Sequence, residues 1–162
     1  MTNEAKLAVL AKVGAALNGA RVSWAVGASL MLYLRRMTDT FHDIDLVTTI
    51  ADADAVCAVL SRLGALQPAN PSALYKTKRF LEFIVDGVEL DVMAGYAITR
   101  YGVDYDRAFD PASVDAHATV GGVTIPLQAV AVWRENYRLM GRADKVALID
   151  GQGVRAPASP KG

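Results

Sequence analysis

The sequence predicts a single domain of the mixed α/β class, in which a small mixed β-sheet is flanked by helices. Segments with helical periodicity alternate along the chain with short β-branched segments. Asp86-Gly87 separates two apolar runs, which is a strong hairpin signal. A length of 162 residues with 52% hydrophobic residues suits one packed core. We therefore expect residues 1–150 to form one domain and residues 151–162 to form a disordered tail.

The first part of the chain carries the clearest secondary-structure signals. Thr2 or Asn3 can cap a first helix, whose leucines and valines recur at helical spacing up to Gly19. A helix after Asp52 is closed by Gly64. The other expected elements are a strand over 21–26, a short helix over 30–34, a strand over 42–50 and a hairpin over 79–85 and 88–93.

The second part of the chain is less regular. Residues 96–118 are rich in Tyr and Asp and have a weak pattern, so we expect irregular structure there. A short strand over 123–125 follows Gly121-Gly122. Pro126 can open a helix that runs to residue 140, and a last short helix is expected over 144–149.

Composition excludes several classes of protein. No apolar run is as long as a membrane span, and the N-terminus lacks the pattern of a signal peptide, so we expect a cytoplasmic protein that does not bind membranes. A formal net charge of zero argues against strong nonspecific binding to nucleic acid. The single cysteine, Cys57, lies among apolar residues and is expected to be a packing residue.

Three aspartates are the candidate chemical centre. Asp43 and Asp45 lie two residues apart on one expected strand, so their carboxylates project from the same face. Asp91 interrupts the apolar strand that follows the hairpin turn, where an unpartnered carboxylate is unfavourable. If the two strands are neighbours, these residues predict a site for a divalent cation, because hard cations prefer carboxylate oxygens. The alternative is a pair of solvated aspartates at an exposed strand end.

A turn of small residues, Gly27-Ala28-Ser29, lies between the first expected strand and a helix. Small residues allow the backbone to approach a phosphate, and the N–H groups of a helix start point toward it. Such turns also serve close packing, so this signal is weak by itself.

The run WAVGASLMLYLRRMTDTFHDIDL, followed by VELDV, resembles the polymerase-β-like nucleotidyltransferase superfamily. The segment around Asp43 is similar to nucleotidyltransferases of the aminoglycoside and lincosamide type. The apolar run that follows the small-residue turn is similar to the AbiEii toxin branch of the superfamily. The resemblance implies the nucleotidyltransferase fold and two Mg²⁺ ions held by Asp43, Asp45 and Asp91. It further implies that Asp91 acts as general base and that Gly27 and Ser29 contact the triphosphate.

Basic residues are candidates for binding the triphosphate, although the C-terminal region departs from the pattern of the superfamily. Arg36 precedes the strand of Asp43, and Arg138 on the long helix is either a phosphate clamp or part of a solvated face. Arg142 and Lys145 follow in Gly141-Arg142-Ala143-Asp144-Lys145, where the last Asp and Lys are exchanged relative to many relatives. Tyr137 occupies the position at which many members of the superfamily have a lysine in the long helix.

The expected function is magnesium-dependent transfer of a nucleoside monophosphate from a nucleoside triphosphate to an acceptor hydroxyl, with release of pyrophosphate. The acceptor is a small molecule such as an antibiotic, or a tRNA or protein. Tyr96, Tyr101 and Tyr105 either line the acceptor pocket or cover a loop-rich edge. Two alternatives stay open: a non-catalytic nucleotide-binding or partner-binding module on the same fold, and a metal-dependent glycosyltransferase that uses the two paired aspartates.

Overall fold

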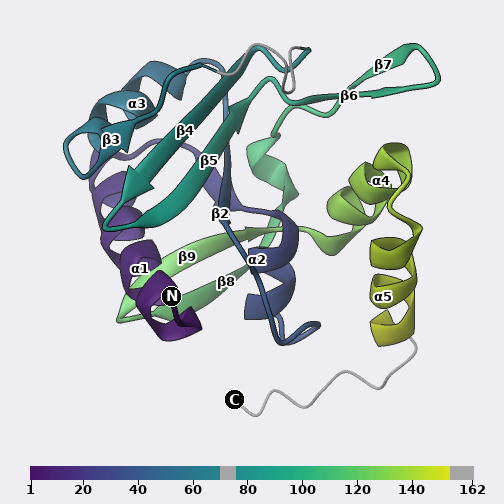
Figure 1. The fold of residues 1–162 in the computed structure, drawn as a ribbon, viewed down its shortest axis with the longest axis horizontal. Helices are drawn as coiled ribbons and strands as arrows, with labels where there is room; N and C mark the ends of the chain where they lie inside the picture. The colour runs from purple at the N-terminus through teal and green to yellow at the C-terminus, as the bar shows by residue number, and fades with distance from the viewer. Residues whose placement is uncertain (70–75, 154–162) are drawn as a thin grey trace.

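A seven-stranded mixed sheet in the order β3-β4-β5-β2-β1-β9-β8 organises the computed structural model, which describes residues 1–69 and 76–153 (Figure 1). Its strands are β1 (Trp24–Val26), β2 (Ile44–Thr48), β3 (Ala65–Leu66), β4 (Arg79–Val85), β5 (Val88–Ala94), β8 (Val114–Val120) and β9 (Val123–Gln128). A separate hairpin consists of β6 (Ala97–Arg100) and β7 (Val103–Asp106). The helices are α1 (Asn3–Ala20), α2 (Ala28–Leu34), α3 (Ala53–Ser61), α4 (Val130–Met140) and α5 (Ala143–Gly153), with a 3-10 turn η1 (Pro111–Ser113).

Strand β2 lies in the middle of the sheet. It pairs antiparallel with β1 and parallel with β5, and the register of the second pair places Asp45 directly beside Asp91. Ile44 and Leu46, which alternate with Asp45, are 0% and 1% exposed. The predicted parity of this strand is therefore confirmed, with apolar side chains in the core and Asp45 on the opposite face.

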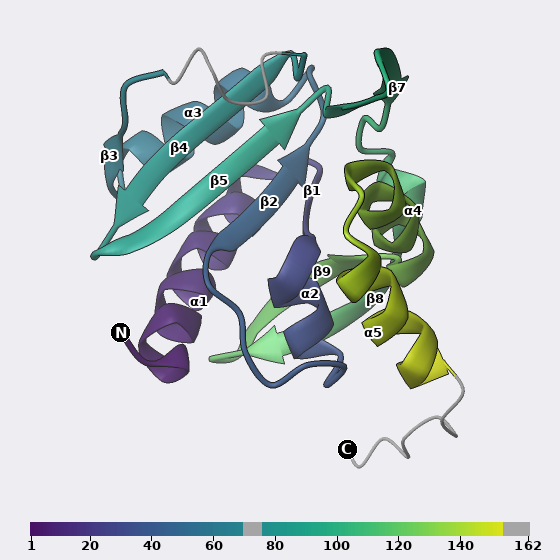
Figure 2. The same cartoon turned by 45° about the vertical axis from the view of Figure 1, so that its right-hand side comes forward.

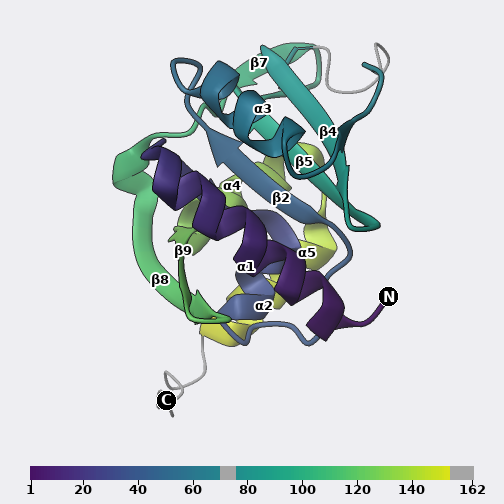
Figure 3. The same ribbon diagram turned by 90° about the vertical axis from the view of Figure 1, so that its left-hand side faces the viewer.

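Helices cover the sheet unequally. Helices α1 and α3 lie together over one face (Figure 3). Helices α4 and α5 pack on each other on the other side of the molecule, where α2 also lies (Figure 2). Leu10, Val13 and Leu17 of α1 are fully excluded from solvent. The mixed α/β class predicted from the sequence is confirmed. No helix in the described ranges is both long and apolar enough to span a membrane.

Residues 96–118 are not irregular, and that prediction is wrong. The segment contains β6, β7 and β8, and β8 pairs with β9 across the turn at Gly121 and Gly122, both of which have positive φ. Burial alternates along β8 because every second side chain, such as Ala116 and Ala118, packs against the core. Strand β8 joins the main sheet through β9, which in turn pairs with β1 from a distant part of the chain.

Pro126 does not open a helix, which corrects a second prediction. It lies within β9 opposite His117, and α4 begins only at Val130. Several other boundaries differ as well. Helix α1 continues past Gly19 to end at the left-handed Arg21, β1 begins at residue 24, and α5 includes residues 151–153. The rest of the expected tail, residues 154–162, lies outside the described residues.

Candidate active site

The three aspartates line one cleft of about 370 Å³, whose other wall includes residues of α4 and α5. Neighbouring strands in a sheet are about 4.8 Å apart, so the register of β2 and β5 brings the backbones of Asp45 and Asp91 to that separation. Asp43 immediately precedes β2 and has the same parity as Asp45. The sequence therefore predicted correctly that these residues lie together.

The cleft concentrates negative charge. Burial raises the pKa of Asp45 to about 7, with further contributions from the charges of Asp91 and Asp43. Burial also raises the pKa of Asp91 to about 6, followed by repulsion from Asp43, Glu82 and Glu89. Within the described part of the chain, none of the three aspartate side chains accepts a hydrogen bond or forms an ion pair. An external cation would relieve this repulsion.

The donor set suits Mg²⁺, which takes oxygen ligands and is commonly bound by one or two carboxylates together with substrate phosphates. As the side chains lie, no three acidic, histidine or cysteine residues among those described are close enough to hold a metal ion by themselves. As the side chains lie, Asp43, Asp45 and Asp91 therefore do not form a complete metal site on their own.

The small-residue turn borders the acids. The backbone N–H of Gly27 donates to the carbonyl of Asp45 at 3.0 Å, which ties the end of β1 to β2. A Cβ at Gly27 would lie 2.5 Å from Nε1 of Trp133, so only glycine fits beneath this ring. Ala28 has a φ of 55°, in the left-handed region that disfavours side chains. Ala28 and Ser29 line the cleft, whereas Gly27 positions the turn behind them.

An aromatic wall, formed by Tyr96, Trp133 and Tyr137, closes one side of the cleft. The ring of Trp133 is stacked on Tyr96 at 6.0 Å and tilted against Tyr137 at 5.6 Å between centroids. Trp133 Nε1 donates to Oε1 of the buried Gln128 at 2.8 Å. The sequence indicated Tyr96 as a possible pocket residue, but Tyr101 and Tyr105 lie on the β6–β7 hairpin instead of in the cleft.

Other cleft residues were missed, namely Phe80, Met93, Trp133 and Met140. Met93 has the same parity as Asp91 and pairs with Phe80 of β4, so strand periodicity could have identified this pair. The place of Trp133 in the cleft could not be predicted, because the sequence does not show that α4 packs beside the small-residue turn. Met140, at the end of α4, is 39% exposed.

Only two of the basic candidates reach the cleft. Arg142 and Lys145 line it, although Arg142 forms a two-pronged ion pair with Asp144 at 3.0 Å. Arg138 is exposed and forms a two-pronged ion pair with Glu135. Arg138 does not line the cleft.

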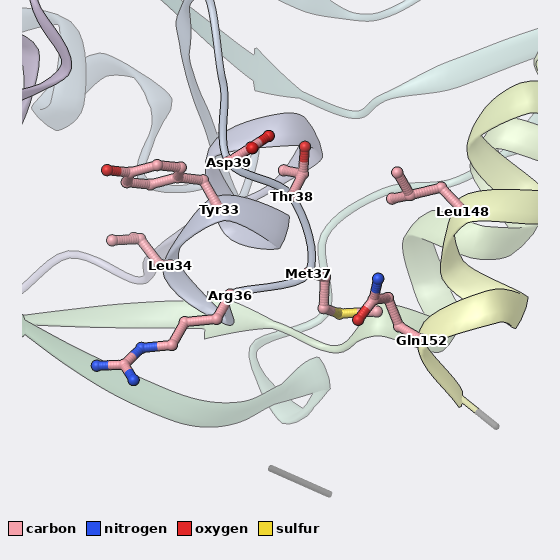
Figure 4. A pocket seen from close by; sticks show the side chains of 8 residues that line it. All are labelled: Tyr33, Leu34, Arg36, Met37, Thr38, Asp39, Leu148 and Gln152. Carbon is pink, nitrogen blue, oxygen red and sulfur yellow. The ribbon is translucent and has the colours of Figure 1, made fainter. Parts of the chain in front are cut away.

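Arg36 lies at a different hollow of about 660 Å³, between the end of α2 and α5 (Figure 4). Its side chain points away from Leu148 and Gln152, which line the opposite side of that hollow. The structure therefore does not bring Arg36 together with the three aspartates.

A family model described as aminoglycoside-2″-adenylyltransferase matches residues 9–150. No curated protein sequence matches the chain. A candidate nucleotidyltransferase of Thermotoga maritima has a similar crystal structure, with 22% identity, a TM-score of 0.68 and 94% of each chain covered.

Two structures of the antibiotic-resistance factor ANT(2″)-Ia are also similar. The crystal structure in complex with adenylyl-2″-tobramycin has 14% identity and a TM-score of 0.61, covering 90% of this chain and 80% of the other. The solution structure has 14% identity and a TM-score of 0.63, covering 92% and 77%. At these identities the similarity shows a common nucleotidyltransferase fold.

Proposed function

Because the chain belongs to the aminoglycoside-2″-adenylyltransferase family, we propose that it is a magnesium-dependent nucleotidyltransferase with an aminoglycoside-type acceptor. The donor is a nucleoside triphosphate, with ATP expected first. The observation that carries the proposal is the convergence of Asp43, Asp45 and Asp91 on one cleft beside a turn of small residues. The three carboxylates make no hydrogen bond or ion pair within the described residues, which suits a cleft completed by a metal-bound substrate.

In the proposed reaction, an acceptor hydroxyl oxygen attacks the α-phosphorus, the bond from this phosphorus to the bridging oxygen breaks, and pyrophosphate leaves. Asp43 and Asp45 would hold Mg²⁺ together with Asp91, and the metal would supply charge neutralisation at the phosphates. Asp91 would also accept the proton of the acceptor hydroxyl, because it is the less enclosed of the two adjacent acids. Ser29 and the turn before it would orient the triphosphate.

The acceptor class agrees with the local charge. The chain has no net charge, but Glu82 and Glu89 lie close enough to Asp91 to raise its pKa, so negative charge continues along β4 and β5 beyond the metal ligands. A neighbouring hollow is lined by Glu82, Glu89 and Asp91. Such a surface attracts an acceptor that carries several ammonium groups and repels the phosphates of RNA.

The test is an acceptor screen read by pyrophosphate release. Purified protein would be incubated with Mg²⁺, each of the four triphosphates, and either a panel of aminoglycosides or tRNA. We expect release that depends on both ATP and an aminoglycoside. The Asp45→Asn variant should lose about 100-fold or more of this activity, because a group that stabilises charge at the reacting phosphate is removed. The matched control, Asp39→Asn at an exposed site outside the cleft, should retain it.

Binding of Mg²⁺-triphosphate without pyrophosphate release from any acceptor would contradict an enzymatic role and favour a nucleotide-binding module. Release with tRNA alone would contradict the acceptor class. Equal activity of the Asp45→Asn variant and the wild type would contradict the assignment of the site.

A further inference from the structure

Asp43 differs from the other two acids of the cleft in lying outside the sheet. Asp45 and Asp91 are paired across the ladder of β2 and β5, and β5 is also paired with β4 on its other side. Strand β2 begins at Ile44, one residue after Asp43, so this ladder does not include Asp43. The position of its carboxylate therefore depends on the segment that leads into β2.

Residues 38–42, which lead into β2, have no regular secondary structure. Within the described ranges, the one hydrogen bond of this segment runs from Lys6 Nζ of α1 to the main-chain carbonyl of Phe41 at 3.1 Å. The same ammonium group lies 5.1 Å from the centroid of the Phe41 ring. Lys6 therefore holds Phe41 by its main chain and by its side chain.

Helix α2 holds the same residue. Phe41 is 2% exposed, and its ring is tilted against the ring of Tyr33 in α2 at 4.8 Å between centroids. Lys6 and Tyr33 thus clamp Phe41 between two helices. Asp43 is only two residues further along the chain, a span of at most about 7 Å, so a shift of Phe41 would move Asp43 as well.

Lys6 does not act as an ion-pair partner of the acids. It lines a hollow of about 260 Å³ together with Asp43 and Glu89. Within the part of the chain that the structure describes, it nevertheless forms no ion pair with an acidic residue. Because its hydrogen bond goes to a main-chain carbonyl, Lys6 fixes the segment and leaves the carboxylate of Asp43 available to a metal ion.

We propose that Lys6 is a positioning residue for Asp43: by clamping Phe41, it holds the Asp43 carboxylate where it can share a divalent cation with Asp45 and Asp91. The cation itself rests on the proposed function. Residues that orient metal ligands contribute to metal affinity without touching the metal. Since the sheet ladder fixes Asp45 and Asp91, loss of Lys6 should disturb one ligand of the three.

The test uses Mn²⁺ alone as the probe, because Mn²⁺ takes the same oxygen ligands as Mg²⁺ and its free form is counted directly by electron paramagnetic resonance. Lys6→Met should weaken Mn²⁺ binding by about 10-fold, the lower end of the loss typical for residues that orient metal ligands. Lys6→Arg should recover part of the affinity, because a guanidinium can donate to the same carbonyl and lie over the same ring.

The sign of the change separates positioning from simple charge. Lys6→Met removes a positive charge from a hollow that Asp43 and Glu89 line, which by Coulomb attraction alone would strengthen the binding of a cation. Positioning predicts weaker binding instead. In an Asp43→Asn background, where the positioned ligand is absent, Lys6→Met should change the affinity for Mn²⁺ by less than about 2-fold.

Lys12 provides a matched control on the same helix. Its ammonium group pairs with Asp86 at 3.0 Å, and both side chains are about half exposed. Lys12→Met removes the same charge from α1 but should not weaken Mn²⁺ binding. Urea denaturation would confirm that each variant is folded. Unchanged or tighter binding in Lys6→Met, an equal loss in Lys12→Met, or an undiminished loss in the Asp43→Asn background would each overturn the inference.

These outcomes separate the positioning role from the enzymatic function. If Mn²⁺ binding depends on both Asp43 and Lys6 but no acceptor receives a nucleotide, the positioning role stands and the function fails. If nucleotide transfer occurs but Lys6→Met binds Mn²⁺ as the wild type does, the function stands and the positioning role fails. A wild type whose Mn²⁺ binding does not depend on Asp43 would overturn the positioning role.

Discussion

Asp45 shows how a single residue can be unfavourable for the fold and still be useful. Its place could be predicted, because strand parity pairs it with Asp43 and because Asp91 interrupts an apolar strand. The size of its pKa shift could not, because the cleft around Asp45 also contains Tyr96 and Tyr137, which come from distant parts of the chain. The sequence thus shows which groups meet, and the three-dimensional packing determines their pKa values.

This perturbation predicts how stability depends on pH in the absence of metal. The pKa of Asp45 is about 7 in the folded protein against 3.8 for the unperturbed group, so the folded state binds more protons between these values. The free energy of unfolding should therefore fall as the pH rises from about 4 to 7. Asp45→Asn removes the buried charge. At pH 8 in EDTA it should raise the free energy of unfolding by on the order of 1–3 kcal/mol.

Urea denaturation of both proteins at pH 8 and at pH 4 would measure this difference, which should nearly vanish at the lower pH. Asp39→Asn, at an exposed aspartate for which the structure shows no ion pair with described residues, serves as the control and should behave as the wild type at both values. A variant Asp45→Asn that is less stable than the wild type at pH 8 would show that the carboxylate is not penalised by burial.

In the turn between β1 and α2, two neighbouring positions are constrained in different ways, one by the space for a side chain and the other by the backbone conformation. Gly27 has a φ of −127°, which any residue can adopt, but it lies against the ring of Trp133. Ala28 has room for its side chain in the cleft lining but carries a φ of 55°. The sequence indicated a turn of small residues here; it could not indicate which position needs glycine, because Trp133 comes from α4.

Exchanging the two residue types should therefore have opposite effects. Gly27→Ala places a Cβ 2.5 Å from Trp133 Nε1 and should lower the free energy of unfolding by about 1–3 kcal/mol, as overpacking does. Ala28→Gly relieves a left-handed alanine and should raise it by about 1 kcal/mol. Urea denaturation would measure both changes. A stabilised Gly27→Ala variant, or a destabilised Ala28→Gly variant, would contradict these assignments.

Whole-molecule topology explains why the sequence predicted the first part of the chain better than the second. Most of residues 24–93 form the strands around β2 with local turns and helices, and their signals are local. Strand β9 pairs in parallel with β1 at Val26 and Leu127, a contact between segments about a hundred residues apart in the chain. That pairing gives Pro126 a place in a strand and sets α4 beside the cleft, which local propensity does not reveal.

Replacing each of the two tryptophans of the chain in turn would show which part of the molecule binds the ligand. Each is buried and donates one side-chain hydrogen bond, Trp24 to Asn18 at 3.0 Å and Trp133 to Gln128 at 2.8 Å. Replacing either by phenylalanine should cost about 1–3 kcal/mol of stability, because a buried side chain loses volume and a hydrogen bond. Only Trp133→Phe should also impair triphosphate binding and nucleotide transfer, because Trp133 supports Tyr96 and Tyr137.

Intrinsic fluorescence distinguishes the two variants directly. Trp24→Phe leaves Trp133 as the single tryptophan, so Mg²⁺-triphosphate should still change the emission of this variant. Trp133→Phe leaves only Trp24, which does not line the cleft, and its emission should not respond to the same ligand even at saturating concentrations. An emission change in Trp133→Phe with none in Trp24→Phe would place the ligand away from α4. It would then contradict both the cleft as the binding site and the role of the aromatic wall, because Trp24 does not line that cleft.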